Sequence, residues 1–566
     1  MKKREELKAM LQRIDHKSYG MYKSLAGSYD YGKYVLHIDH VQGDPFASPS
    51  RMRFEISRNR HHFPREYYEY KWRRLALEDQ ILRRFHNRLT QMERGNMGSG
   101  KSGRITTCPV GQKILERIAV VFSENRMELR FEMGFPARGR TILAREMQQL
   151  LFEVLPALAE HCLIYDNWEE KGKRQLLKAV NLADDQKALR EELEKRGLCA
   201  FVADGAILPR ESGISDRPMK NAVPFVSPES LRVEITLPHK GTITGMAIPK
   251  GITVIVGGGY HGKSTLLRAL EQGVYSHVSN DGREYVAAQN DAVKIRAEDG
   301  RSVLHTDISM FINHLPGGRD TGDFSSENAS GSTSQAANLI EALETGSRLL
   351  LLDEDTSATN FMIRDKVMSC LVSDEKEPIT TLLRHIRGLW EQEGISFVIV
   401  VGSSGDYLSV ADLVLQMDHY RVKDVTGEAR DICKEAGIAG QYDAGKVKMP
   451  EFSRKLLPQK AGRMKYKAMG TDTVMIDREV IDVRYLEQLS DNGQTTGLAY
   501  LMGYILAGQQ TVQNLTDVIE SLYEIIEKKG FAAVIPEGYS CGQPVLPRKQ
   551  ELYACLSRYR KARIIK

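Results

Sequence analysis

The sequence of 566 residues has few of the features that mark secreted and membrane proteins. Its 7 cysteines are an odd number without a C-x-x-C pair, which argues for a reducing compartment and against a disulfide scaffold or a zinc site. No apolar run approaches the roughly 18 residues of a membrane span. The first residues, MKKREELKAM, lack the apolar segment of a signal peptide. We therefore expect a cytoplasmic protein without an integral membrane segment.

Charge is also modest, because the net charge is +5 with 27% charged residues. Any affinity for nucleic acid or membranes would have to come from local patches. The chain is too long for one hydrophobic core, and about three domains are expected.

The character of the sequence changes twice along the chain. Residues 1–198 mix Gly- and Pro-containing loops with helical stretches, whereas strands and helices alternate over 199–428. Such alternation is typical of a largely parallel sheet flanked by helices. Residues 429–566 are helical and polar in places. We predict an α/β fold: a mixed α+β N-terminal domain (1–198), an α/β domain (199–428) and a smaller α-rich C-terminal domain (429–566).

Two stretches match the phosphate-binding pattern G-x-x-x-x-G-K-[ST], namely GNMGSGKS at 95–102 and GGGYHGKS at 257–264. The pattern binds nucleotide only between a buried strand and a helix, whose N-terminus then faces the phosphates. The apolar run GITVIV precedes the second stretch and STLLRAL follows its lysine, as required. The first stretch follows a basic helical region and is followed by Gly and Pro, so a flexible turn is favoured there.

We therefore predict that the second stretch is the ATP-binding P-loop. Its nucleotide-contacting residues would be Gly257, Gly258, Gly259, Tyr260, His261, Gly262, Lys263, Ser264 and Thr265.

A run of leucines (349–352) leads into Asp353 and Glu354. A buried strand ending in two carboxylates is typical of a Walker B strand, in which the first holds Mg²⁺ and the second activates water. We therefore predict Asp353 and Ser264 as metal ligands and Glu354 as the catalytic base. A charged strand end at the protein surface is the alternative for either carboxylate alone.

Between these motifs lies ENASGSTSQAANLIEALE, which resembles the signature segment of ABC ATPases. Ser330 precedes Asp353 by 23 residues (330 to 353), and the family segment has a similar spacing. The resemblance implies that Ser330, Gly331 and Ser332 contact nucleotide bound to the opposite subunit. The alternative is an ordinary N-capped helix.

Several other ABC elements are altered. Asn360 stands where the D-loop usually has Asp, and no His follows the strand ISFVIVVG, so Ser403 or Ser404 would have to contact the γ-phosphate. A hydroxyl can donate a hydrogen bond there but cannot titrate near neutral pH. The Q-loop glutamine has no clear counterpart, and Asp307 is our predicted substitute at the metal.

The combination GGGYHGKSTLL, SGSTSQAANLIEALE, LLLLDEDTSATNFMIRD and GSSGDY, together with YKSLAGSYDYGKYVLHIDHVQGDPFASPSR and GSGKSGRI nearer the N-terminus, resembles the predicted ABC-class ATPases found across bacteria. A member of that family belongs to the RNA-editing machinery of trypanosomatid mitochondria. The resemblance covers most of the chain. It implies an ATPase that binds ATP and Mg²⁺ and is a homodimer when nucleotide is bound, with RNA as the partner in the characterised branch of the family.

Two basic regions independently suggest RNA or another nucleic acid as partner. REYYEYKWRR (65–74) interleaves aromatic and cationic side chains, as a base-stacking surface would, but a helix with a buried aromatic face has the same pattern. Near the C-terminus, cations gather in 454–467 and 548–566, where a solvated surface is the alternative. The latter segment includes Arg548, Lys549, Arg558, Arg560, Lys561, Arg563 and Lys566.

These observations favour an ABC-class ATPase that couples hydrolysis of Mg·ATP in a homodimer to conformational change on RNA. Two alternatives remain. The absent switch histidine is compatible with a nucleotide-gated scaffold that hydrolyses little ATP. An ATPase subunit of a separate membrane complex is also compatible with the motifs, although the flanking domains argue against it.

Overall fold

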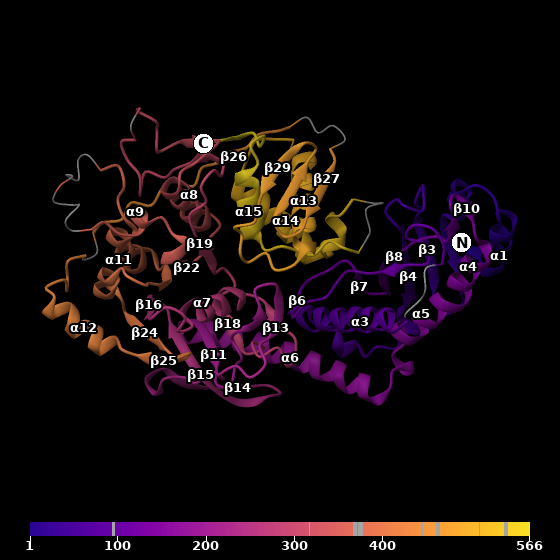
Figure 1. Ribbon diagram of the computed structural model, residues 1–566, viewed down its shortest axis with the longest axis horizontal. Coiled ribbons are helices and arrows are strands. Elements are labelled where there is room, and N and C mark those ends of the chain that lie inside the picture. Colours follow the sequence, from indigo (N-terminus) through magenta and orange to yellow (C-terminus); the bar gives the residue numbers. More distant parts are fainter. Residues whose placement is uncertain are drawn as a thin grey trace. The chain divides into compact units, whose positions relative to one another are not determined.

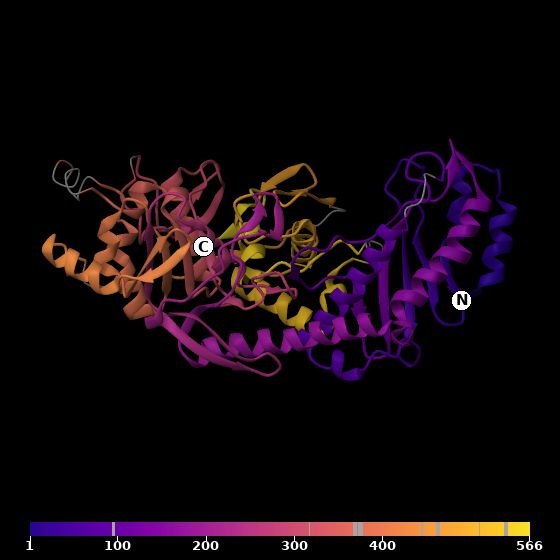
Figure 2. The same ribbon diagram turned by 60° about the horizontal axis from the view of Figure 1, so that its bottom comes forward.

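The computed structural model describes residues 1–566 except 93–96, 316, 366–370, 372–376, 443–444, 460–463, 509 and 537–541. The chain forms two compact units. The first contains Met1–Asp184 and Ile526–Leu546, and the second contains Asp185–Ile525 and Pro547–Lys566. Helix α6 (Glu170–Lys195) runs from one to the other as a continuous helix, seen lengthwise in Figure 2.

The first unit is built on a sheet with strand order β1-β2-β3-β4-β8-β5, in which β7 also pairs with β8. These strands are β1 (Lys2–Lys3), β2 (Gly27–Asp30), β3 (Val35–His40), β4 (Ser50–Ser57), β5 (Ile105–Thr106), β7 (Val120–Phe122) and β8 (Arg126–Met133). In β4 every second residue is buried, including Met52, Phe54 and Ile56, so one face is apolar.

Helices of the first unit include α1 (Arg4–Arg13), α3 (Lys71–Gln91) and α5 (Leu155–Leu163). Helix α3 buries Leu77, Ile81 and Phe85, which recur every four residues on one face. The aromatic segment before it is mixed: Tyr67 is buried, whereas Tyr70 is 47% exposed and its ring stacks on Trp72 with centroids 4.9 Å apart.

The second unit contains a six-stranded sheet with the order β19-β22-β23-β16-β24-β25. All neighbours pair in parallel except β24 and β25, which form a hairpin. The strands are β16 (Ile252–Gly257), β19 (Val293–Ile295), β22 (Leu349–Asp353), β23 (Ser396–Val400), β24 (Leu413–Asp418) and β25 (Arg421–Asp424). Strands β22 and β23 are buried throughout, as their continuous apolar sequences predict for a parallel sheet covered on both faces.

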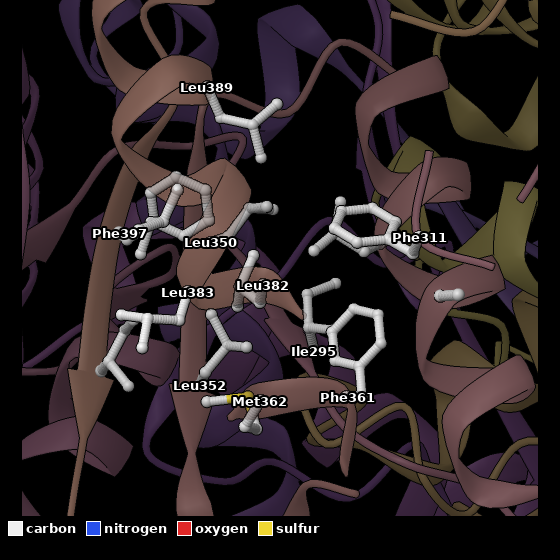
Figure 3. Close-up of a cluster of buried hydrophobic side chains, with 14 of the residues drawn as sticks. Ile295, Phe311, Leu350, Leu352, Phe361, Met362, Leu382, Leu383, Leu389 and Phe397 are labelled. Carbon is white, nitrogen blue, oxygen red and sulfur yellow. The ribbon is translucent and has the colours of Figure 1, made fainter. Parts of the chain in front are cut away.

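The core of this unit lies between the sheet and helices α8 (Gly331–Glu344) and α11 (Leu382–Glu393) (Figures 1 and 3). Leu350 and Leu352 of β22 meet Leu382 of α11 and the rings of Phe311 and Phe361, whose centroids are 5.0 Å apart. This packing sets the position of the carboxyl end of β22.

A second, antiparallel sheet has the order β14-β15-β11-β18 and its own apolar cluster. Its strands are β11 (Leu198–Ala203), β14 (Arg232–Leu237), β15 (Gly241–Pro249) and β18 (Val286–Ala288). Strand β15 leads directly into β16, the strand that precedes the second glycine-rich loop.

The last part of the chain has the helices α13 (Asn492–Gly508), α14 (Leu515–Lys529) and α15 (Lys549–Arg558). Figure 1 shows α13 and α15 with β27 (Tyr466–Met469) and β29 (Glu479–Asp482), which pair with β28 (Thr473–Ile476). Helix α13 packs against β27 at Gly503, where a Cβ would lie 2.5 Å from the Tyr466 ring. Strands β26 (Lys455–Leu456), β30 (Gln513–Asn514) and β31 (Ile564–Ile565) form a further small sheet. Neither small sheet was expected from the sequence.

The three-domain division stays a prediction. Strand β11 begins at Leu198, next to the expected first boundary, and the expected second boundary (428/429) falls inside α12 (Thr426–Glu435). Among the described residues no helix is long and apolar enough to span a bilayer. The described cysteines Cys108, Cys162, Cys199, Cys433 and Cys555 are buried and form no disulfide among themselves, and Cys370 and Cys541 lie outside the described residues.

Candidate nucleotide site

The second glycine-rich loop joins β16 to helix α7 (Lys263–Gln272). Two of its glycines are required by geometry. Gly257 has φ 142° and a Cβ there would lie 2.3 Å from the Met417 carbonyl oxygen, and Gly262 has φ 101°. Lys263 Nζ donates to the carbonyl oxygens of Gly257 (2.6 Å) and Gly258 (3.0 Å). The first N–H groups of α7 have no partner within the helix, so the loop can accept a phosphate at this end.

The first glycine-rich loop has a different geometry. Backbone N–H groups of Ser99, Lys101 and Gly103 donate to carbonyl oxygens of Ala137 (2.6 Å), Pro45 (3.1 Å) and Gly134 (2.8 Å). These donors are therefore not free to wrap a phosphate. Gly98 is required because the loop packs closely on its neighbours: a Cβ there would lie 2.2 Å from the Ala137 carbonyl oxygen, and a Cβ on the neighbouring Gly134 would lie 1.8 Å from the Lys101 carbonyl oxygen.

The described residues after the first loop form strand β5 (Ile105–Thr106) and not a helix. The structure supports a packing role for this loop. Gly95 and Asn96, its first two residues, lie outside the described residues.

The Walker B strand ends at the same sheet edge as the P-loop. Asp353 of β22 pairs in register with Val400 of β23, and Val400 pairs with Ile255 of β16, two residues before Gly257. Because adjacent strands are about 4.8 Å apart, Asp353 lies about two strand spacings from the P-loop strand. Asp353 is buried, and its Oδ1 accepts a hydrogen bond from the N–H of Asp355 (3.3 Å). Ser264 and Asp353 offer hydroxyl and carboxylate oxygens, the donors that Mg²⁺ prefers.

Glu354 is held by the loop that follows β23. Its Oε1 accepts hydrogen bonds from the hydroxyls of Ser403 (2.6 Å) and Ser404 (2.7 Å), and its Oε2 from the N–H groups of Gly402 (2.5 Å) and Ser403 (3.0 Å). Burial opposes the charged form, but these hydrogen bonds outweigh it and lower the pKa of Glu354 to about 2. In this arrangement Ser403 contacts the predicted base.

The signature segment begins helix α8. Ser330 is its N-cap, and its hydroxyl lies 2.9 Å from that of Thr333. The segment also contacts the D-loop of the same chain, because Asn360 Nδ2 donates to Ser332 Oγ (3.5 Å). Gln335 strengthens the link by accepting from the N–H of Ala358 (2.7 Å). An N-cap and a nucleotide contact are compatible roles, since an N-cap leaves other N–H groups of the first turn available.

Asp307 lies in a different setting from the one we predicted. Its Oδ2 is 2.9 Å from Lys566 Nζ, and its Oδ1 accepts from the hydroxyl of Ser309 (2.6 Å). These contacts are with the C-terminus and its own turn, and its role at the metal stays a prediction.

Asp299 is a candidate residue of the nucleotide site that the sequence analysis did not predict. It follows β19, the neighbour of the Walker B strand at the sheet edge, and the N–H of Ala297 donates to the carbonyl of Thr356 just beyond that strand (3.0 Å). Asp299 is exposed, and its Oδ1 would lie 3.3 Å from a Cβ on Gly331. A carboxylate thus stands between the Walker B end and the signature segment. The only sequence signal was an acidic pair after a short apolar strand.

Next to the P-loop, the ligand atoms of His261, Asp418 and His419 lie within 4.8 Å of one another. Because Mg²⁺ prefers oxygen ligands, this group is not a candidate for the metal of the nucleotide. Tyr260, at the tip of the P-loop, has φ 63° and is 98% exposed.

The C-terminal cations fall into two classes, which corrects one expectation. Arg558 is buried and paired with Glu298, and Arg454 is buried and paired with Glu344. Because both guanidinium groups are shielded from solvent and neutralised by a carboxylate, they cannot contact an RNA phosphate. Arg548 is likewise paired with Glu551. Among the described residues of the two basic segments, the exposed cations are Lys455, Lys465, Lys467, Arg560, Lys561, Arg563 and Lys566, of which Lys566 pairs with Asp307. Lys460 and Arg463 lie outside the described residues.

Comparison with known proteins places the chain in a family. Three family models match consecutive parts of it: the N-terminal domain of ATPases of the ABC class at 4–166, the P-loop domain of ABC ATPases at 172–452 and the MRB1590 C-terminal domain at 465–565.

Two curated proteins are similar over part of their length. The uncharacterized protein MJ1628 of Methanocaldococcus jannaschii is 30% identical over 283 residues, which are 48% of this chain and 62% of that protein. The aliphatic sulfonates import ATP-binding protein SsuB 2 of Xanthomonas axonopodis pv. citri is 26% identical over 191 residues, 31% of this chain and 60% of that protein. The chain therefore spans less than two thirds of either relative.

Among solved structures, cbiO1 from Clostridium perfringens, part of the ABC transporter complex cbiONQ, matches with 18% identity over 37% of this chain and 90% of that chain, at a TM-score of 0.21. The resemblance inferred from the motifs is confirmed by the three family models, which follow one another along nearly the whole chain. With a P-loop and a Walker B strand ending at one edge of its parallel sheet, the protein belongs to the ABC-class P-loop ATPases.

Proposed function

We propose that this protein binds and hydrolyses Mg·ATP in a nucleotide-sandwich homodimer and couples the cycle to conformational change on RNA, in the cytoplasm. The observation that carries the proposal is the sheet edge shared by the P-loop of Lys263 and the strand end with Asp353 and Glu354, where Glu354 is bonded to the loop of Ser403. In this proposal Lys263 exchanges its two loop carbonyls for phosphate oxygens, a change from neutral to charged acceptors.

Ser264 and Asp353 would hold Mg²⁺, which supplies charge neutralisation at the β- and γ-phosphates. Glu354 would orient and deprotonate the attacking water. To do so, its carboxylate has to give up hydrogen bonds from Ser403 and Ser404, whose hydroxyls could then donate to the γ-phosphate. Asp299 would orient hydrogen-bonding groups that lie between the carboxyl end of β22 and the signature segment at the start of α8.

A homodimer would complete the site. Ser330, Gly331 and Ser332 begin α8, and we propose that they contact the nucleotide of the second copy across the interface. Light scattering in the presence of Mg·ATP tests this. We expect a dimer that dissociates when ATP is replaced by ADP, and a Ser330→Arg variant that binds ATP but stays monomeric. A dimer of the same stability in this variant would contradict the assignment.

A second candidate function is a nucleotide-gated scaffold with little turnover. The tight binding of Glu354 by the 402–404 loop favours it, because a carboxylate with a pKa near 2 is a weak base. Steady-state turnover of the parent protein, compared with the Glu354→Gln variant, separates the two functions.

We propose RNA as the partner on the basis of the exposed C-terminal cations. Replacing Arg560, Lys561 and Arg563 with alanine should weaken single-stranded RNA binding and reduce the slope of log K against log salt by up to about 2, roughly 0.7 for each lost phosphate contact. Filter binding or anisotropy at several salt concentrations measures this, and ATP turnover without RNA should change little.

A matched control removes the same charge elsewhere, from Lys423, Arg430 and Lys434, which are also exposed. Equal losses in both triple variants would mean that only net charge matters. No RNA affinity in the parent protein would remove RNA from the proposal.

A further inference from the structure

Six buried charges lie where the last part of the chain meets the ATPase sheet. We call residues 454–525 and 547–566 of the second unit the C-terminal region. It supplies Arg454 and Arg558, and the nucleotide-binding part supplies one arginine and three glutamates. The full set is Arg301, Arg454, Arg558, Glu298, Glu341 and Glu344.

Arg558, at the end of α15, joins two elements of the nucleotide site. Its Nη2 lies 2.6 Å from Glu298 Oε1, next to Asp299, and 2.8 Å from Asn338 Oδ1 in α8. Asn338 in turn donates to the carbonyl of Arg296 (2.8 Å). One arginine of the C-terminal region therefore connects the segment that follows β19 with the signature helix.

Arg454 makes a second connection to α8. Its Nε donates to Glu344 (3.0 Å), in the last turn of α8, and its Nη2 donates to the hydroxyl of Tyr553 in α15 (2.9 Å). Thus the second half of α8, from Asn338 to Glu344, is bonded to the C-terminal region.

The C-terminal region is also hydrogen-bonded to α7, the helix that follows the P-loop. Gln488 is buried, and its Nε2 donates to the carbonyls of Glu271 in α7 (3.0 Å) and Ala292 (3.0 Å), while its Oε1 accepts from the N–H of Lys294 in β19 (3.1 Å). The Tyr275 hydroxyl donates a hydrogen bond to the Gln488 carbonyl oxygen (2.8 Å).

Burying these charged groups costs free energy, so the network is better explained by the arrangement of helices that it fixes than by a gain in stability. Buried ion pairs often add no net stability over an apolar contact, whereas a buried charge without its partner is strongly destabilising. The network therefore holds α7, β19 and α8 in one arrangement relative to the C-terminal region. Helices α7 and α8 each begin at a predicted phosphate-binding loop, and both are bonded to this region along their later turns.

We propose that Arg558 and Gln488 are positioning residues through which the C-terminal region follows nucleotide occupancy, an inference that rests on the proposed ATP binding. A shift of α8 relative to α7 on nucleotide binding must move Arg558 relative to Gln488, because each is bonded to one of these helices. Nucleotide occupancy is thereby transmitted to the sheet β27–β29, whose outer face includes the exposed Met469 and Val480.

Hydrogen exchange with and without Mg²⁺ and a non-hydrolysable ATP analogue tests this in the full chain. In the parent protein we expect slower exchange in α7 and α8 and also in α15 and residues 466–482. In Arg558→Met/Glu298→Met, which removes both charges together, we expect the response of the C-terminal region to fall at least fivefold. Analogue affinity should stay within about threefold, since neither residue belongs to the proposed nucleotide site.

The matched control is Lys549→Met/Glu520→Met, which removes a solvent-accessible ion pair (2.6 Å) within the C-terminal region and should leave its response unchanged. Arg558→Lys, which keeps the charge opposite Glu298, should restore part of the response. Gln488→Met tests the other anchor if the double variant does not fold, and we expect the same loss of response.

Three outcomes would overturn the proposal. A C-terminal response that persists in the Arg558→Met/Glu298→Met and Gln488→Met variants excludes these residues. A parent protein that responds only around α7 and α8 excludes transmission while leaving the proposed ATP binding intact. No response to the analogue anywhere removes the proposed function and this inference together.

Discussion

Replacing Lys263 with alanine is expected to lower the affinity for Mg·ATP by at least about 100-fold. In the free protein Lys263 Nζ bonds to two neutral carbonyls of the P-loop, which it would exchange for charged phosphate oxygens. Losing two charge-assisted hydrogen bonds, at roughly 1.5–3 kcal/mol each, accounts for a change of this size. Equilibrium binding of a fluorescent ATP analogue measures it.

Lys101→Ala is the matched control, because Lys101 occupies the same position in the other glycine-rich loop. We expect its ATP affinity to stay within about twofold of the parent, since the backbone donors of that loop already bond to protein carbonyls. Equal losses in both variants would show that the first loop also binds nucleotide.

Glu354→Gln is expected to bind ATP normally and to hydrolyse it about 10²–10⁴-fold more slowly. The amide can still accept a hydrogen bond from water but cannot take its proton. The amide oxygen can still accept from the N–H groups of Gly402 and Ser403, and the amide NH2 can donate to the hydroxyl oxygens of Ser403 and Ser404, so the loop after β23 should keep its place. Single-turnover hydrolysis and ATP-dependent dimerisation should be measured together, because the slowed variant should accumulate as a dimer.

Asp355→Asn is the control for Glu354→Gln. It removes a neighbouring exposed carboxylate that has no role in the proposed mechanism, and turnover should stay close to that of the parent. If Glu354→Gln kept its turnover within a factor of about three, less than about 1 kcal/mol of barrier, Glu354 would not be the base. If the parent itself turned over no faster than this variant, the scaffold function would be the better description.

Strands β16 and β22 and the P-loop could be predicted because the sequence pattern that marks each of them is local. A run of leucines before Asp353, or GITVIV before a glycine-rich loop, carries both the buried strand and the chemistry within about ten residues. Parallel strands covered on both faces have continuous apolar sequences, and helix N-termini next to them bind phosphate. The sequence alone therefore determined the ATPase class and was sufficient to predict roles for Lys263, Asp353 and Glu354.

Other features depended on contacts between distant segments. Whether the N–H groups of residues 99–103 were free depended on carbonyls at 45, 134 and 137. Arg558 and Arg560 belong to one basic segment, yet packing of α15 against α8 buries the first against Glu298 and leaves the second exposed.

The place of Asp299 depended on which strand lies beside β22, which a one-dimensional pattern does not contain. Tertiary structure decided these points because hydrogen bonding and burial are satisfied by whichever groups the fold brings together, irrespective of their separation along the chain.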